Sequence, residues 1–238
     1  MRLDDPEAVA REYADERGLE GRRSAYEHSE GPDAREVAFA AVAEVAPRRV
    51  LEVGCGPGEL TARFRAELGA QVAAIDISPR MVELARRRGI EADVGDVQDL
   101  GRFGDESFDC AVAAWMLYHV PDLERGLAEL ARVLRPGGRL VAVTNAPDHL
   151  REVDELVGVE RAALAFDSVN ADGLLRGHFE RVERREAFGW LVFPDRRAVE
   201  VYVEASRTLQ GGGEVPADFE GPLRVRRRPV VFVAEKAA

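Results

Sequence analysis

Hydrophobic positions along the chain follow two alternating periods. Short runs of aliphatic and β-branched residues predict buried strands, and each is followed by a segment whose hydrophobic residues recur every three or four positions, as in a helix. The predicted strands in the middle of the chain span residues 50–53, 72–75, 90–94, 108–114 and 139–144. The predicted helices between them span residues 59–68, 79–88 and 123–134. This alternation predicts an α/β fold with a mainly parallel sheet and right-handed crossovers.

The flanking segments carry weaker patterns of the same two kinds. On the N-terminal side, helices are predicted over residues 6–17 and 33–46. On the C-terminal side, helices are predicted over residues 149–166 and 195–209, and strands over residues 182–188 and 224–234. These C-terminal strands are candidates for the far edge of the same sheet.

A glycine-rich loop follows the first central strand. Gly54, Gly56 and Gly58 are separated by single residues, and a predicted helix begins directly after them. Without Cβ atoms the loop lets a ligand approach the backbone, and the helix N-terminus offers unpaired N–H groups. The spacing Gly-x-Gly-x-Gly differs from the Gly-x-Gly-x-x-Gly of dinucleotide-binding proteins, which disfavours a nicotinamide oxidoreductase.

Acidic side chains stand at the ends of consecutive predicted strands. Glu52 lies near the end of the first, and Asp76 and Asp96 follow the second and third. Because the carboxyl ends of parallel strands meet at one edge of a sheet, these groups are expected to converge near the glycine loop. Asp76 is suited to accept hydrogen bonds from two ribose hydroxyls and Asp96 from an adenine amino group. Glu52 beside them favours a ligand with a cationic group.

Five ordered motifs in this stretch support a family resemblance. They are EVGCGPG at 52–58, DISPRM at 76–81, GDV at 95–97, SFD at 107–109 and LRPGGRL at 134–140. On these motifs the chain resembles class I S-adenosylmethionine-dependent methyltransferases, and most of all the broad group that acts on small molecules and in quinone biosynthesis. The resemblance implies a Rossmann-like, mostly parallel seven-stranded sheet with an antiparallel last strand and helices on both faces.

The resemblance also implies where S-adenosylmethionine binds. The glycine loop would pass beneath its methionine part, Asp76 would hold its ribose, and Asp96 would read its adenine edge. The cofactor-binding residues implied in this way are Glu52, Gly54, Cys55, Gly56, Gly58, Asp76, Ile77, Met81, Asp96, Val97 and Ala114.

The same resemblance suggests a division of the chain. Residues 1–32 would form an N-terminal cap or lid, and residues 33–238 a methyltransferase domain. Within that domain, residues 47–145 would form the cofactor half, and residues 146–238 a C-terminal half with insertions on the substrate side.

Candidate residues for the methyl acceptor lie beyond the fourth strand and in the N-terminal segment. Displacement at a sulfonium methyl depends mainly on alignment, and a base assists an oxygen, nitrogen or carbon nucleophile. His119 has the intrinsic pKa of such a base and is the predicted catalytic residue, with packing against the cofactor loop as the alternative. The predicted substrate-pocket residues are Tyr13, Tyr26, Trp115 and Tyr118.

The sequence leaves the role of two tyrosines open and places two histidines away from the site. Tyr13 and Tyr26 either staple the N-terminal segment to the core or belong to a lid over the pocket. His149 and His178 are expected on the surface of the C-terminal half.

Composition narrows the class of protein. The net charge of −11 disfavours nucleic acid as a partner. Two cysteines give no disulfide framework and indicate a reducing, cytoplasmic location, and no apolar run is long enough to predict a membrane span. The four histidines show no ligand spacing, so no metal is predicted. Arginine supplies nearly all positive charge, which suggests a bacterial, GC-rich genome. We expect a monomer or homodimer.

The leading hypothesis is therefore a methyltransferase that acts on a small molecule. One alternative is an RNA base methyltransferase, for which the only basic cluster is Arg224 with residues 226–228. Another is a catalytically silent regulatory protein that binds S-adenosylmethionine.

Overall fold

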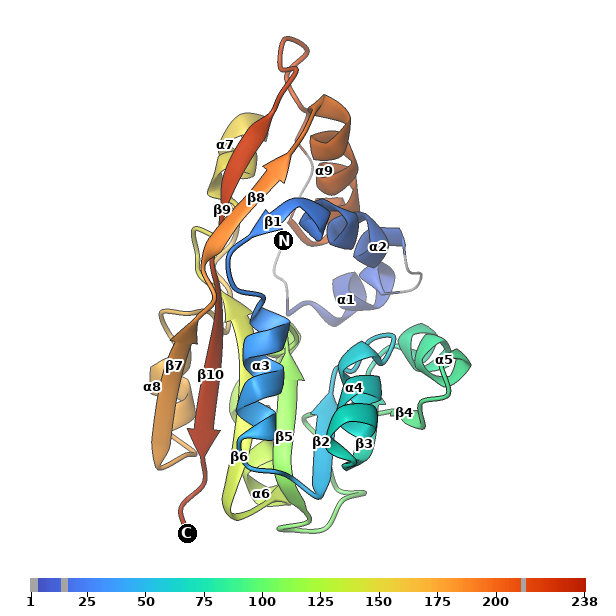
Figure 1. The fold of residues 1–238 in the computed structure, drawn as a ribbon, viewed down its shortest axis with the longest axis vertical. Coiled ribbons are helices and arrows are strands. Elements are labelled where there is room, and N and C mark those ends of the chain that lie inside the picture. The colour runs from blue at the N-terminus through green and yellow to red at the C-terminus, as the bar shows by residue number, and fades with distance from the viewer. Residues whose placement is uncertain (1–3, 14–16, 211–212) are drawn as a thin grey trace.

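The computed structural model describes residues 4–13, 17–210 and 213–238. The strands of its larger sheet are β2 Arg49–Val53, β3 Gln71–Asp76, β4 Ala92–Val94, β5 Phe108–Ala114, β6 Leu134–Asn145, β7 Arg181–Glu186 and β10 Pro229–Glu235. They lie in the order β4-β3-β2-β5-β6-β10-β7 (Figure 1). β2 to β6 run parallel, whereas β10 is antiparallel to both of its neighbours. The predicted α/β class, with a seven-stranded, mostly parallel sheet, is confirmed.

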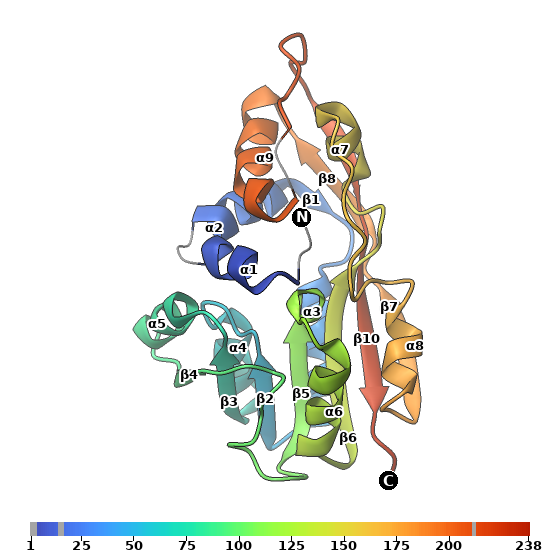
Figure 2. The same ribbon diagram turned by 180° about the vertical axis from the view of Figure 1, so that it is seen from behind.

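Helices cover both faces of this sheet (Figures 1 and 2). Successive residues of β2 point to opposite faces, so that Val50 belongs to the hydrophobic cluster with residues of α3 and α4, and Leu51 to the cluster with residues of α6 and α8. The helices of this layer are α3 Ala34–Ala43, α4 Glu59–Leu68, α5 Pro79–Arg87, α6 Leu123–Val133 and α8 Ala171–Arg176, and the 3-10 turn η2 Leu117–His119 follows β5.

Side-chain caps begin three of these helices. The side chain of Asp33 accepts a hydrogen bond from Arg35 N at the start of α3. Ser78 Oγ accepts one from Met81 N at the start of α5, and Asp122 Oδ1 accepts one from Arg125 N at the start of α6. Each cap satisfies a backbone donor that the first helical turn leaves unpaired, which fixes where these helices begin.

A second, smaller sheet lies beyond one end of the first. Its strands are β1 Ser29–Glu30, β8 Gly189–Phe193 and β9 Leu223–Arg227, in the order β1-β8-β9. The single strand predicted over residues 224–234 is therefore wrong, because the chain changes sheets at Arg228. The backbone N–H of Arg228 donates to a histidine side chain instead of a ladder partner, and Pro229, which has no N–H, begins β10.

The helix predicted over residues 149–166 is shorter than expected. α7 spans Arg151–Val157, and Gly158 then adopts the left-handed conformation with a φ of 68°. Glycine accepts this conformation without a steric cost, and it ends the helix. The chain from residue 159 to residue 168 runs without regular secondary structure on the inner side of the smaller sheet.

The N-terminal segment packs beside the smaller sheet. It contains α1 Pro6–Glu12, α2 Arg17–Ser24 and the 3-10 turn η1 Ala25–His28, and it contacts α9 Arg196–Gln210. The sequence did not predict α2, because glycine lowers helix propensity. Gly21 instead permits a close approach, since a Cβ there would lie 2.6 Å from Ala205 Cβ of α9.

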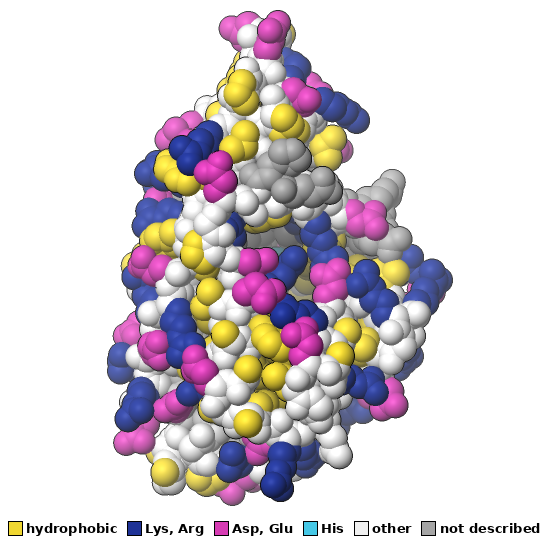
Figure 3. Space-filling view, viewed as in Figure 1, with side chains coloured by type: hydrophobic (Ala, Val, Ile, Leu, Met, Phe, Trp, Pro, Cys, Tyr) yellow, Lys and Arg dark blue, Asp and Glu magenta, His cyan; other side chains and the backbone are white. Residues whose placement is uncertain are grey.

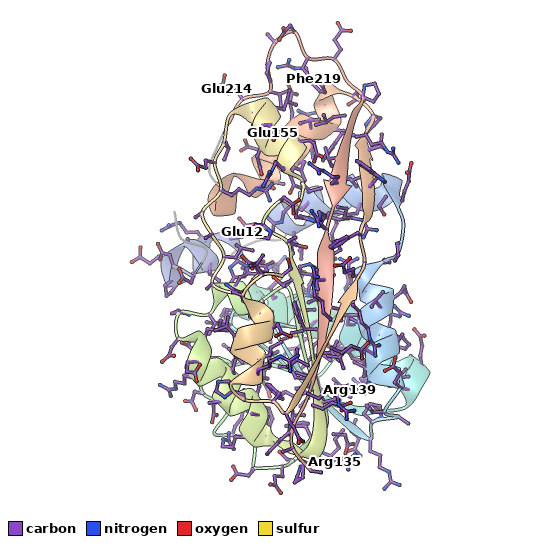
Figure 4. The ribbon with its side chains drawn as sticks, turned by 90° about the vertical axis from the view of Figure 1, so that its left-hand side faces the viewer. Glu12, Arg135, Arg139, Glu155, Glu214 and Phe219 are labelled. Atoms are coloured by element: carbon purple, nitrogen blue, oxygen red, sulfur yellow. The ribbon has the colours of Figure 1, made fainter. Side chains whose placement is uncertain are left out.

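A buried ion pair fixes this segment. Glu12 is 6% exposed and bonds to Arg22 Nη1, which also donates to Ala205 O at 2.6 Å. Arg139 plays a similar part at the other end of the molecule, where it donates to Ala41 O at 2.7 Å and to Glu235 (Figure 4).

None of the helices in the described ranges is long and apolar enough to cross a bilayer.

Candidate active site

A cavity of about 1260 Å³ separates the two sheets. The ends of β2, β3 and β5 form one wall, and α1, α2, β9 and the chain around residues 145–164 form the other. Figure 3 shows a hollow near the middle of one face, with charged side chains beside it. The predicted site residues that line the cavity are Tyr13, Tyr26, Glu52, Gly54, Cys55, Gly56, Asp76, Ile77, Met81, Asp96, Val97, Ala114, Trp115, Tyr118 and His119.

The glycine loop turns sharply at the end of β2. Gly54, Gly56 and Gly58 all have positive φ angles, of 66°, 53° and 81°. A Cβ on Gly56 would meet no protein atom within 4 Å, so its open side faces the space where a ligand would lie. Gly58 does not line the cavity, because its Cβ position lies against Ile90 and Ala85.

Asp76 links the loop to the start of α5. Its Oδ2 accepts a hydrogen bond from Gly56 N at 2.8 Å, and its Oδ1 accepts one from Ser78 N at 2.9 Å. Burial raises the pKa of Asp76, and these two hydrogen bonds oppose that shift. Each carboxylate oxygen keeps a further lone pair, so Asp76 is able to accept two more hydrogen bonds from a diol in the cavity.

The side of the cavity next to Asp76 is suited to a flat, partly apolar group. Ile77 is 53% exposed, which is unusual for an isoleucine, while Met81 and Val97 are buried. Asp96 is partly buried and accepts hydrogen bonds from Gln98 N at 2.8 Å and from Gln98 Nε2. The remaining lone pairs of Asp96 are available to an amino group at the ring edge.

Glu52 carries the most perturbed carboxyl of the cavity wall. It is 3% exposed, and Thr61 Oγ1 donates a hydrogen bond to its Oε2. Burial raises the pKa of Glu52, and the hydrogen bond from Thr61 opposes this shift. The resulting pKa is about 8. At neutral pH the carboxyl is therefore mostly protonated, and a nearby ammonium group would favour its ionised form.

This shift makes the stability of the protein depend on pH. The pKa of Glu52 in the folded protein lies above the pKa of 4.5 of an unperturbed glutamate. The unfolded chain therefore binds fewer protons between these values, and stability falls as pH rises through that window. Relative to the wild type, Glu52→Gln should gain up to ~1.4 kcal/mol in free energy of unfolding for each pH unit between 5 and 8.

Urea denaturation at a series of pH values measures this difference. Glu67→Gln is the control, because Glu67 is an exposed residue of α4 whose pKa is lowered by Arg63, so it is ionised throughout this window in both states. A Glu52→Gln difference that stays constant from pH 5 to pH 8 would contradict a protonated Glu52.

Tyr13 connects the N-terminal segment to the wall of the cavity that contains Ser78 and His119. Ser78 Oγ donates to the carbonyl of Tyr13 at 2.8 Å, and the Tyr13 hydroxyl lies 3.2 Å from His119 Nε2. The His119 ring also packs edge-on against Tyr118, with 4.5 Å between ring centroids. Burial raises the pKa of Tyr13 to about 12, so it stays protonated. Tyr13 therefore staples the segment to the core and also lines the cavity.

Tyr26 makes a comparable contact with His149. Its hydroxyl lies 3.1 Å from His149 Nε2, while His149 Nδ1 accepts a hydrogen bond from Arg228 N at 2.9 Å. The prediction that His149 lies on the surface is wrong, because it is 5% exposed and lines the cavity. Burial and two nearby arginines lower the pKa of His149 to about 3. The one feature of the sequence that could have indicated a place for His149 in the cavity is its position shortly after the strand predicted over residues 139–144.

Trp115 lies in the cavity wall, whereas His178 does not. Trp115 has a φ of 54°, a strained conformation for a large side chain, and its Nε1 donates to Asn145 Oδ1 at 3.3 Å. His178 lies away from the cavity, 2.9 Å from Glu124 Oε1. Within the ranges that the structure describes, no cluster of three metal-ligating side chains occurs.

Comparison with known proteins identifies the part of the chain that holds this site. The methyltransferase domain family matches residues 51–142. Residues 51–142 are thus similar to a methyltransferase domain. The chain is 43% identical over 107 residues to a ubiquinone biosynthesis O-methyltransferase of Xanthomonas oryzae, an alignment that covers 42% of this chain and 44% of the relative. The chain thus matches under half the length of such curated relatives.

Solved structures extend the similarity to the whole fold. A SAM-dependent methyltransferase of Thermotoga maritima, described as a possible histamine N-methyltransferase, is 25% identical with a TM-score of 0.55, covering 85% of this chain and 89% of that one. The [4+2]-cyclase SpnF is 17% identical with a TM-score of 0.62, covering 97% and 95%. The fold is thus that of class I methyltransferases, and it also hosts other chemistry.

The methyltransferase domain supplies only one wall of the cavity. It contains the glycine loop, Asp76, Asp96 and His119. Tyr26, His149 and the rest of the opposite wall lie outside the matched residues, so the family match does not describe that wall.

Proposed function

We propose that the protein transfers a methyl group from S-adenosylmethionine to a small-molecule acceptor. The observation that carries this proposal is the convergence of Asp76, Asp96 and the open side of Gly56 on one cavity. These groups fit the ribose, the adenine edge and the methionine backbone of the cofactor. Exposed Ile77 fits the adenine face, and Glu52 fits the methionine amino group.

The cofactor supplies an electrophilic methyl group on a sulfonium sulfur. The contribution of the protein is mainly alignment, which can be worth roughly 7–11 kcal/mol in such reactions. Asp76 and the glycine loop fix the donor, and we assign to His119 the removal of a proton from the acceptor. The position of His119, directly after β5 and in the cavity wall beside Trp115 and Tyr118, supports this role.

Substitution of His119 tests this assignment. His119→Gln should lower kcat about a hundredfold, the usual size of general-base catalysis, and leave the dissociation constant of adenosylhomocysteine within about twofold. Stopped-time turnover assays and calorimetry measure the two quantities. His178→Gln, outside the cavity, should change neither. A parallel loss of cofactor affinity in His119→Gln would assign His119 to the cofactor site instead.

A small-molecule acceptor is favoured over RNA because the basic cluster is already paired. Arg224 lies 2.8 Å from Glu30, Arg226 lies 2.7 Å from Glu152, and Arg228 pairs with Asp148. Arg227 is only 4% exposed. Surface ion pairs of this kind leave few cations for phosphate contacts, and the negative overall charge adds to the argument.

The first experiment is a titration followed by a turnover assay. Calorimetry should give one-site binding of adenosylhomocysteine and none of NAD, and release of adenosylhomocysteine from S-adenosylmethionine in the presence of acceptor pools should report turnover. Binding without turnover in any pool would favour a silent regulatory protein.

The buried free thiols of Cys55 and Cys110 support a cytoplasmic location, and residues 1–32 fit a cap over the cavity. We propose a monomer or homodimer.

A further inference from the structure

A buried arginine, Arg227, and a partly buried one, Arg161, line the part of the cavity that lies outside residues 51–142. Arg227 on β9 is 4% exposed and donates from Nη2 to Pro32 O at 2.7 Å, but its Nε has no acceptor in the described part of the chain. Arg161 pairs with Asp154 and donates from Nη1 to His149 O at 3.2 Å, and its buried Nη2 likewise has no acceptor. Buried donors without partners are costly, so these atoms call for a ligand oxygen.

A third arginine joins them from α3. Arg35 lines the same cavity and lies 5.9 Å from the centre of the Trp115 ring. Among the described residues it forms no ion pair with a carboxylate. Its backbone N–H, not its guanidinium, bonds to the nearest capping carboxylate, Asp33. The charge of Arg35 is therefore presented to the cavity beside Trp115.

Tyr26 adds a neutral donor to the same place. His149 Nδ1 accepts from Arg228 N, so in the neutral ring the proton sits on Nε2 and is donated to the Tyr26 oxygen. The Tyr26 hydroxyl hydrogen then remains for another acceptor. Arg227, Arg161 and Arg35 line the same cavity as Tyr26.

The buried carboxylate of Asp167 forms no ion pair with these arginines among the described residues. Asp167 is 7% exposed and lines the cavity, but its Oδ1 accepts hydrogen bonds from Val169 N at 2.6 Å and from Asn170 N at 3.1 Å. It caps the turn before α8 rather than an arginine. Asp167 Oδ1 is thus engaged by backbone donors, and Arg227 Nε and Arg161 Nη2 keep no acceptor among the described residues.

We propose that this wall binds an oxyanion, a carboxylate or a phosphate group, carried by the methyl acceptor. Arg35, Arg161, Arg227 and Tyr26 would donate to it, because guanidinium groups match the geometry of both oxyanions. The contact of Arg35 with Trp115, which directly follows Ala114, sets the oxyanion site next to the methionine end of the cofactor site. The inference rests on the proposed function and names its substrate class as anionic small molecules.

Anion titration of the cofactor-loaded protein tests the site. The protein, saturated with adenosylhomocysteine, is titrated with inorganic phosphate and with acetate at constant ionic strength. Trp115 fluorescence is followed in a Trp190→Phe background, which removes the only other tryptophan. We expect a saturable signal for at least one anion, and at least tenfold weaker binding in Arg161→Met and in Arg35→Met.

Arg226→Met is the matched control. Arg226 is the exposed neighbour of Arg227 on β9 and points to the opposite face, so its loss should change anion affinity less than twofold. Tighter binding of phosphate than of acetate would indicate phosphate esters as acceptors, and the reverse would indicate carboxylic acids.

The result separates this inference from the proposed function. Failure of adenosylhomocysteine to bind would contradict the methyltransferase assignment itself. Normal adenosylhomocysteine binding with no saturable anion signal, or with equal losses in Arg226→Met and Arg161→Met, would overturn the oxyanion site alone.

Discussion

Gly56→Ala should weaken adenosylhomocysteine binding at least a hundredfold while the protein remains folded. Gly56 has a φ of 53°, so alanine there costs about 1–2 kcal/mol of stability. The new Cβ would touch no protein atom within 4 Å and would project into the space that we assign to the methionine part of the cofactor. Calorimetry gives the affinity, and thermal unfolding gives the stability.

Two other glycines serve as controls for this prediction. Gly89→Ala carries the same backbone strain, with a φ of 77° and no protein atom within 4 Å, but Gly89 lies outside the cavity and should keep normal affinity. Gly54→Ala should instead destabilise the fold, because its Cβ would lie 2.8 Å from Met116 Cβ. Equal affinity losses in Gly56→Ala and Gly89→Ala would contradict the proposed position of the cofactor.

Asp76→Ala should have an effect of similar size for a different reason. The variant loses the acceptor of two ribose hydrogen bonds, each worth roughly 1.5–3 kcal/mol to a charged group, so we expect a loss of affinity of at least a hundredfold. It also frees Gly56 N and Ser78 N, which loosens the loop. The measurement is again calorimetry, with circular dichroism to verify the fold.

The control for Asp76 lies on the neighbouring strand. Asp93 on β4 is half-exposed and pairs with Arg86 and Arg102 at the surface, so Asp93→Ala should bind adenosylhomocysteine normally. If Asp76→Ala bound the cofactor as tightly as the wild type, the ribose would not be held at Asp76, and the binding mode proposed for the whole cavity would have to be abandoned.

The convergence of the glycine loop and Asp76 on one cavity wall could be predicted because its signals are local. The strand before Gly54, the cap at Ser78 and the carboxylate at Asp76 each act within a few residues of one another. The rule that parallel strands end at one edge then brought these segments together without any knowledge of tertiary contacts.

Of the opposite wall the sequence indicated Tyr13 and Tyr26 but none of their partners, because these contacts are distant in sequence. Tyr26 meets a histidine 123 positions away, and Arg227 bonds to a carbonyl 195 positions away. No periodicity marks such partners. The strand change at Arg228 likewise depends on a side chain from another segment, His149, which takes the backbone N–H that would have continued the ladder.

The position of β10 between β6 and β7 has a consequence for how the chain acquires its shape on the ribosome. Of the described strands, β10 is made last, yet it lies inside the sheet with partners on both sides. β7 therefore has no partner in this sheet until residues 229–235 have emerged. Arg227 arrives with the same stretch, so the cofactor wall is complete in the growing polypeptide well before the pocket opposite it.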